Sequence, residues 1–108
     1  ILLQTFSRLD VDLILTTGGT GIGPRDNPPE VTLKVIEKNI PGVVERMRSI
    51  GSQKTPNAVL SRAVAGTVRG KLIINLPGSP TGAVESLDAI ADVIPHAIGM
   101  LKNLDLHK

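Results

Sequence analysis

A glycine-rich segment in the first quarter of the chain has the residue types that bind phosphate groups. Four glycines fall between positions 18 and 23, and Arg25 and Asp26 follow them. Glycine lets a backbone approach a ligand closely and point its N–H groups inward, which suits an anion. Arg25 offers a guanidinium fork to a phosphate, and Asp26 offers oxygen ligands to a Mg²⁺ ion that bridges phosphates. Residues 18–26, named the glycine loop below, are therefore predicted to bind phosphate.

A purely structural role for the glycine loop is the alternative. Glycines after a buried strand often serve only a tight turn, and Arg25 and Asp26 could form a local ion pair or cap a helix. Such connections are usually about 2–6 residues long, whereas this one has nine residues, from 18 to 26. The length and the adjacent charges favour the functional interpretation.

A second loop, residues 77–82, has a related composition. It reads Pro-Gly-Ser-Pro-Thr-Gly and follows another apolar run. Ser79 or Thr81 could cap the next helix, or could bind an anion at its positive end. If both apolar runs are parallel strands of one sheet, the two loops emerge at the same edge and flank one crevice. Ser61 and Arg62, beside a predicted strand, are further candidates for contact with an anionic ligand.

The elements that position these loops follow from the apolar spacing. Residues 11–17 form a nearly continuous aliphatic run, typical of a strand buried on both faces in a parallel sheet that helices cover. The other predicted helices are a helical tail at 1–9, a helix from Pro29 with Val31, Val35 and Ile36 toward the core, and, after a break at Pro41, a shorter helix with Val43, Met47 and Ile50. Two further strands are predicted at 63–68 and 72–76 around a turn. A C-terminal helix follows, and Pro95 is expected to split it near 92–94. The pattern predicts an α/β fold with a mostly parallel sheet.

Composition indicates one small domain, residues 1–108, and argues against several functions. With 41% apolar residues, a single aromatic residue and a net charge of +2, the chain lacks the stacking platforms and basic excess of nucleic-acid binders. It has no cysteine, so disulfides and thiolate metal sites are excluded, and no apolar run approaches the length of a membrane span. His96 and His107 have no second ligand at metal-like spacing.

The two loops and the segments between them resemble a known family. The matching segments, in order, are Thr16-Thr17-Gly18-Gly19-Thr20-Gly21, Pro24-Arg25-Asp26, Pro29-Glu30, Pro41-Gly42, Leu60-Ser61-Arg62, Ala65-Gly66 and Ile73-Ile74-Asn75-Leu76-Pro77-Gly78-Ser79. Together they resemble the molybdopterin adenylyltransferase family of molybdenum cofactor biosynthesis, which includes the MoaB/Mog proteins and the G domain of gephyrin. The glycine string alone is weakly specific. Its combination with Arg25, Asp26 and the second loop is specific and covers nearly the whole chain.

This resemblance implies a fold and a reaction. The fold is a three-layer α/β sandwich that binds molybdopterin, and the reaction is the Mg²⁺-dependent transfer of AMP from ATP to molybdopterin with release of pyrophosphate. Asp26 is implied to be the catalytic acid and metal ligand. The residues implied to contact the substrates are Thr17, Gly18, Gly19, Thr20, Gly21, Arg25, Ser61, Arg62, Asn75, Pro77, Gly78 and Ser79, with Arg25 and Arg62 as electrostatic helpers or structural residues. The resemblance further implies a cytoplasmic homotrimer and suggests a molybdenum-insertion enzyme as partner.

Two departures from the family pattern affect the implied site. The family's N-terminal strand-helix-strand, which carries a second important acid, is missing, so we expect further residues before Ile1 in the whole protein. Asn27-Pro28 stands where the family has an apolar residue and a threonine, so we expect Asp26 or Asn27 to cap the next helix. A capping Asp26 would be less available to a metal ion.

Two other functions compete with adenylyl transfer. The first is a non-catalytic pterin-binding or scaffold domain of the same fold, since one fold can serve several functions. The second is a nucleotide hydrolase of the competence-protein type, which Thr20, Arg25 and Asp26 disfavour.

Overall fold

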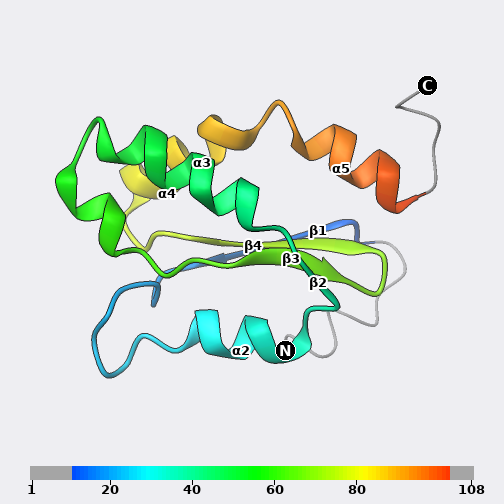
Figure 1. Ribbon diagram of the computed structural model, residues 1–108, viewed down its shortest axis with the longest axis horizontal. Coiled ribbons are helices and arrows are strands. Elements are labelled where there is room, and N and C mark those ends of the chain that lie inside the picture. The colour runs from blue at the N-terminus through cyan, green and yellow to red at the C-terminus, as the bar shows by residue number, and fades with distance from the viewer. Residues whose placement is uncertain (1–10, 103–108) are drawn as a thin grey trace.

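The computed structural model describes residues 11–102 and has three layers (Figure 1). Its elements are, in chain order, β1 (Leu13–Thr17), α2 (Pro28–Val35), β2 (Lys38–Asn39), α3 (Pro41–Ser52), the 3-10 helix η1 (Pro56–Leu60), β3 (Ala65–Val68), β4 (Lys71–Leu76), α4 (Pro80–Ile90) and α5 (Ile94–Leu101). Helices α3, α4 and α5 cover one face of the sheet, and α2 lies on the other. The α/β sandwich is thus confirmed. The predictions for residues 1–9 and for His107 lie outside the described residues.

The sheet is mixed, with strand order β1-β4-β3-β2. Strands β1 and β4 are parallel, as the two-loop hypothesis requires, but β3 runs antiparallel to both β4 and β2. The expectation of a mostly parallel sheet is therefore corrected for residues 11–102. The physical cause is the hairpin at Arg69 and Gly70, where φ values of 50° and 76° allow a two-residue turn. Strand β2 has only two residues and no apolar alternation, so the sequence pattern did not predict it.

Strand β4 is the centre of the core, and all six of its residues are buried, so the strand predicted at 72–76 is confirmed. Leu72 and Ile74 pack with Met47 of α3 and Ile90 of α4, while Ile73 packs with Ile14 toward α2. Alternate side chains of a strand point to opposite faces, so β4 joins the two helical layers. Strand β1 is less enclosed than predicted, because it lies at the edge of the described sheet and Leu15 is 39% exposed.

Proline residues begin the helices of this chain. Pro41 opens α3 instead of only ending the helix before it, and Pro95 lies in the first turn of α5. A first-turn N–H has no partner within the helix, so proline is tolerated there. The predicted split near 92–94 is confirmed, since α4 ends at Ile90 and α5 begins at Ile94.

Helix α2 turns a different face to the core from the one predicted. Pro29 and Thr32 are buried, whereas Val31 is 42% exposed. The helix begins at Pro28, and its register places Thr32 against Asn75 of β4. Val35 and Ile36 are half-buried and pack against the cluster around Ile73, so that part of the prediction is confirmed.

Within residues 11–102, no helix combines the length and the apolar character that a membrane crossing needs.

Asn75 ties the layers together through a fully buried side chain. Its Oδ1 accepts a hydrogen bond from the backbone N–H of Val64 at 3.0 Å. Its Nδ2 donates to Thr16 Oγ1 at 2.8 Å and to Thr32 Oγ1 at 3.1 Å. The amide therefore joins β4 to β1, to α2 and to the segment before β3. Because the side chain has 0% exposure, it cannot touch a ligand directly, which corrects its expected role in substrate contact.

Asn75→Ala is expected to lower the free energy of unfolding by about 2–4 kcal/mol, since it leaves buried polar groups without partners. The midpoint of urea denaturation measures the change. The exposed Asn39 provides the matched control, and Asn39→Ala is expected to stay within about 0.5 kcal/mol of the parent. Equal stability of the two variants would contradict the structural role of Asn75.

A candidate ligand-binding crevice between two loops

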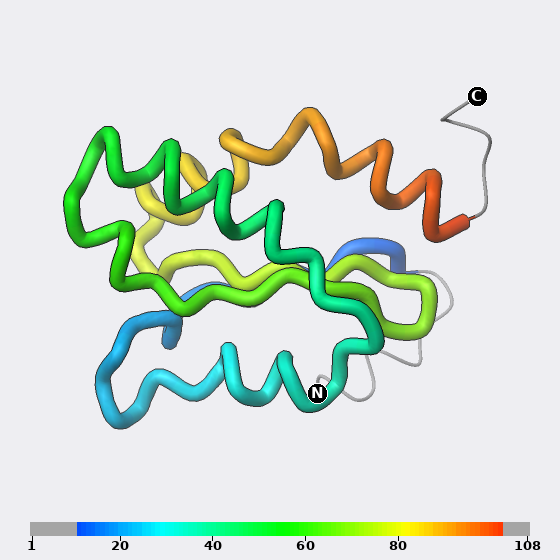
Figure 2. Tube along the Cα trace, viewed as in Figure 1, coloured from blue at the N-terminus to red at the C-terminus, as the bar shows by residue number. Residues whose placement is uncertain are grey.

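The glycine loop and the second loop meet at one end of the sheet (Figure 2). The backbone N–H of Gly18 donates to the carbonyl of Leu76 at 2.9 Å. A Cβ atom built on Gly78 would lie 3.1 Å from the Cα of Gly18, so the two backbones touch. This contact follows from the parallel pairing of β1 with β4 and confirms that both loops border one crevice.

The first two glycines of the loop adopt backbone conformations that side chains rarely allow. Gly18 and Gly19 have φ values of 86° and 69°. A Cβ atom on Gly19 would lie 2.5 Å from Cδ of Pro28, so the proline ring occupies the space beside this glycine. Pro28, which stands where the family has a threonine, therefore packs against the loop.

Asp26 folds back into the glycine loop. Its Oδ2 accepts a hydrogen bond from the N–H of Gly23 at 2.8 Å. A Cβ atom on Gly21 or on Gly23 would lie 2.9 Å from the same oxygen, so both positions require glycine for this arrangement. The other oxygen, Oδ1, has no hydrogen-bond partner within residues 11–102.

The expectation that Asp26 or Asn27 caps the following helix is wrong. Asn27 is the residue before α2, and its side chain makes no capping hydrogen bond. Pro28 and Pro29 begin the helix and have no N–H, so two of the donors that a cap would satisfy do not exist. Asp26 is thus not consumed by capping.

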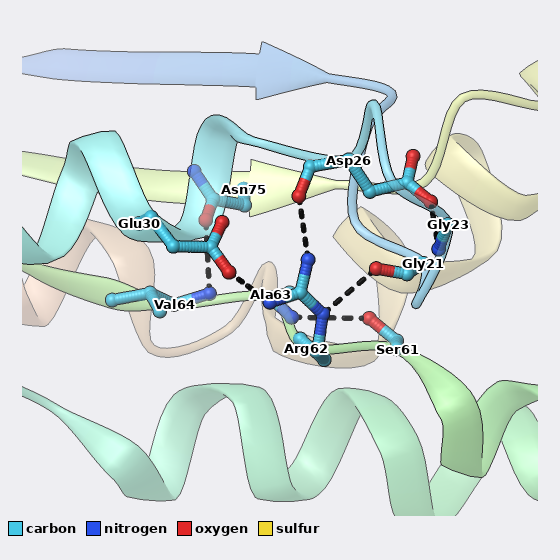
Figure 3. Close-up of polar contacts among 9 residues, drawn as sticks. All are labelled: Gly21, Gly23, Asp26, Glu30, Ser61, Arg62, Ala63, Val64 and Asn75. Carbon is cyan, nitrogen blue, oxygen red and sulfur yellow. Dashed lines mark hydrogen bonds and ion pairs between the residues drawn. The ribbon is translucent and has the colours of Figure 1, made fainter.

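Arg62 holds the glycine loop in place (Figure 3). Its Nε donates to the carbonyl of Gly21 at 2.7 Å, and its Nη2 donates to the carbonyl of Asp26 at 2.5 Å. Its backbone N–H donates to the carbonyl of Thr20 at 2.8 Å. The third nitrogen, Nη1, forms an ion pair with Glu30 of α2. Each of the three side-chain nitrogens of Arg62 thus donates to the protein, which fits the structural alternative of its predicted role.

The same contact changes the acidity of Glu30. The hydrogen bond from Arg62 lowers the pKa of the Glu30 carboxyl below its ordinary value of 4.5. The ion pair is consequently intact above that ordinary value and is lost as the pH falls through the lowered pKa.

A cavity of about 440 Å³ opens between the two loops and the helices α3 and α4. It brings together residues from three separate predicted segments, and these are Thr20, Gly21, Ser61, Pro77 and Ser79. The carboxylate of Asp26 lies directly against Gly21 and so stands beside the cavity wall.

The other predicted site residues do not line this cavity. Gly18 and Gly78 form the contact between the loops, and Gly19 packs against Pro28. The side chains of Thr17 and Arg25 are exposed outside the cavity. Arg62 and Asn75 support the loops from within. Contact with substrate stays a prediction for the backbone groups of the glycines and for the exposed side chains of Thr17 and Arg25.

Two helix faces that the motifs did not mark complete the cavity. Helix α3 contributes Val44, Met47 and Gly51, which recur at spacings of three and four. Helix α4 contributes Glu85 and Ser86, which lie beyond the second loop. Such spacing is the ordinary sign of a core-facing helix, so the sequence alone gave no reason to assign these residues to a site.

The described residues offer limited but suitable ligands for a magnesium ion. Within 11–102, no group of three His, Cys, Asp or Glu side chains could hold a metal ion by itself. Mg²⁺ at nucleotide sites is commonly held by one or two carboxylates together with the substrate phosphates. The free Oδ1 of Asp26 fits that arrangement.

The fold and the crevice define an α/β domain with a cavity beyond the carboxyl ends of two parallel strands, the usual place of a ligand site in such sheets. Residues 2–96 match the family described as "Probable molybdopterin binding domain", and the chain belongs to this family.

Individual relatives agree with this assignment. Over 100 residues the chain is 42% identical to the molybdopterin adenylyltransferase of Helicobacter pylori (strain J99), with 93% of this chain and 57% of that protein covered. It is 39% identical over 102 residues to gephyrin of Dictyostelium discoideum, with 94% of this chain and 14% of gephyrin covered. The molybdopterin biosynthesis Mog protein of Mycobacterium ulcerans superposes with a TM-score of 0.88 at 46% identity, and 94% of this chain and 67% of that one are covered. The chain thus spans little more than half of the Helicobacter relative.

Proposed function

We propose that this chain carries the substrate-binding crevice of a molybdopterin adenylyltransferase and acts in molybdenum cofactor biosynthesis. The observation that supports the proposal is the single cavity that Thr20, Gly21 and Ser79 share, with the Asp26 carboxylate against its wall. The relatives named molybdopterin adenylyltransferase support it as well.

The proposed reaction joins two phosphorylated molecules. An oxygen of the terminal phosphate of molybdopterin attacks the α-phosphorus of ATP, and the bond to the β-phosphate oxygen breaks. Pyrophosphate leaves with the electron pair of that bond, and adenylylated molybdopterin remains. Because both reactants are anions, the protein contributes mainly by positioning them and by neutralising their charge.

The residues of the crevice suit these tasks. The glycine loop suits a phosphate group through its backbone N–H groups, and α4 suits one through the positive N-terminal end of its helix dipole. Ser79 Oγ accepts a hydrogen bond from the N–H of Gly82 at 3.0 Å, so the hydroxyl hydrogen is left for a ligand. Asp26 would hold Mg²⁺ through its free oxygen, and the ion would neutralise phosphate charge when bound.

A non-catalytic pterin-binding domain is the second candidate. One observation favours it, since the described part of the crevice has one carboxylate beside the glycine loop and no cluster of metal ligands.

One assay on the intact protein distinguishes adenylyl transfer from non-catalytic pterin binding. Given molybdopterin, ATP and Mg²⁺, it is expected to release pyrophosphate in proportion to the molybdopterin consumed. Tight pterin binding without pyrophosphate release would replace the first candidate by the second. Absence of pterin binding would reject both.

The assembly and setting of the protein are part of the same proposal. We infer a single domain over residues 1–108 that forms a cytoplasmic homotrimer and delivers its product to a molybdenum-insertion enzyme. Exposed apolar side chains, among them Val59 and Val84, offer surface for contact between subunits. A monomer in sedimentation velocity would contradict the trimer.

A further inference from the structure

One acidic residue of the cavity lining has no part in the proposed reaction. Within the described residues, Arg48 and Glu85 are the two charged side chains of the cavity lining. Arg48 Nη1 donates to the carbonyl of Ser61 at 3.2 Å, which ties it to the wall. Glu85 belongs to neither loop.

The position of Glu85 follows from the helical repeat of α4. Ser79, Gly82 and Glu85 are spaced by three residues, so they lie on one face of the helix, and all three line the cavity. Six residues of helix correspond to about 9 Å along its axis. Glu85 therefore lines the cavity about 9 Å beyond the first turn of α4, a distance that the ring of a ligand with its phosphate at that turn can span.

Among residues 11–102, one oxygen of Glu85 has no hydrogen-bond partner. Oε2 lies 3.6 Å from Nζ of Lys54, a separation too long for a strong hydrogen bond. Lys54 is itself 54% exposed. Oε1 has no hydrogen-bond partner within residues 11–102. The carboxylate thus stands between this cavity and a neighbouring hollow that Lys54 lines, and Oε1 can still accept hydrogen bonds.

The chemistry of the two substrates differs at the edge that a carboxylate would recognise. A pterin ring presents an amino group beside a ring N–H, which can donate two parallel hydrogen bonds to one carboxylate. Adenine presents its amino group beside a ring nitrogen that accepts, so only one such bond can form. Val44 and Met47 provide apolar contact for the face of a flat ring.

We propose that Glu85 selects the pterin ring and that this cavity holds the pterin, with the adenine of ATP placed elsewhere. This inference rests on the proposed function for the identity of the two substrates. It adds a specificity-determining residue outside both loops.

A binding assay on the intact protein tests the inference. The probes are 6-hydroxymethylpterin monophosphate, its analogue with oxygen in place of the 2-amino group, AMP and GMP, titrated by fluorescence or calorimetry. The parent is expected to bind the pterin about tenfold or more tightly than the oxo analogue, because the analogue places an acceptor against the carboxylate. Glu85→Gln is expected to remove that preference and to leave the affinity for AMP unchanged.

Lys54→Gln is the matched control, because it removes the ion pair and keeps the carboxylate. It is expected to keep the preference for the pterin. Unchanged pterin affinity in Glu85→Gln, or an equal loss for AMP, would overturn the inference. GMP has the same amino and N–H edge, so Glu85-dependent binding of GMP as tight as that of the pterin would overturn the assignment to pterin.

The outcome is independent of catalysis. If the parent protein prefers the pterin to its oxo analogue through Glu85 but releases no pyrophosphate, this inference is upheld and adenylyl transfer is rejected.

Discussion

Asp26→Ala is expected to reduce pyrophosphate release by about 100-fold or more while pterin binding persists, as removal of one charge-stabilising group commonly does. Among the described residues, Oδ1 of Asp26 has no hydrogen-bond partner, and the carboxylate lies against Gly21 at the cavity wall. Loss of this group removes the proposed ligand of Mg²⁺ and leaves the cavity itself intact. Initial rates of pyrophosphate release, measured with a pterin titration on the same sample, test the prediction.

A second substitution separates the charge of Asp26 from its part in folding the loop. Asp26→Asn keeps an oxygen that can accept from the N–H of Gly23 but removes the negative charge. The same loss of rate is expected, with an unchanged unfolding midpoint. Asp88, an exposed residue of α4, serves as control, and Asp88→Asn is expected to retain the parent rate. Full activity of Asp26→Asn would contradict a role for the charge.

Arg62→Ala is expected to lower both activity and stability, because the variant releases the glycine loop. Its side chain donates to Gly21 and Asp26 and pairs with Glu30. Hydrogen bonds from charged groups contribute about 1.5–3 kcal/mol, and partial exposure places the expected loss of stability near the lower end. Displacement of a site by about 1 Å can cost roughly 100-fold in rate. Urea denaturation and the pyrophosphate assay measure the two effects.

The pKa of Glu30 distinguishes release of the loop from general destabilisation. Arg62 lowers this pKa, so in Arg62→Ala the pKa is expected to rise toward the ordinary value of 4.5 in an NMR titration. Arg46→Ala is the control, since Arg46 forms an exposed ion pair with Asp92 that contributes about 1 kcal/mol or less. An unchanged Glu30 pKa in Arg62→Ala would show that the contact does not form in solution.

The sequence was sufficient to predict the two loops and their meeting. The aliphatic runs before Gly18 and before Pro77 are typical of buried strands, and parallel pairing brings their carboxyl ends to one edge. The split before Pro95 also follows from local chemistry, because proline lacks the N–H that a helix interior needs. These features depend on neighbouring residues in the chain.

Features that depend on distant residues could not be predicted in the same way. The contacts of Arg62 with Gly21 and Asp26 join positions 41 and 36 residues apart, and no local pattern marks them. The burial of Asn75 depends on Thr16 and Thr32 from two other elements. Glu85 lies on a helix face whose spacing is shared by any core-facing helix, so only the fold shows that this face borders a cavity.

The most direct test of the central claim is a crystal structure of the intact protein with molybdopterin and a non-hydrolysable ATP analogue. We expect the terminal phosphate of molybdopterin between the glycine loop and the first turn of α4, in the cavity that Gly21 and Ser79 line. We also expect the Asp26 carboxylate within reach of a metal ion on the phosphates. Both ligands bound outside this cavity, with the two loops free of phosphate, would contradict it.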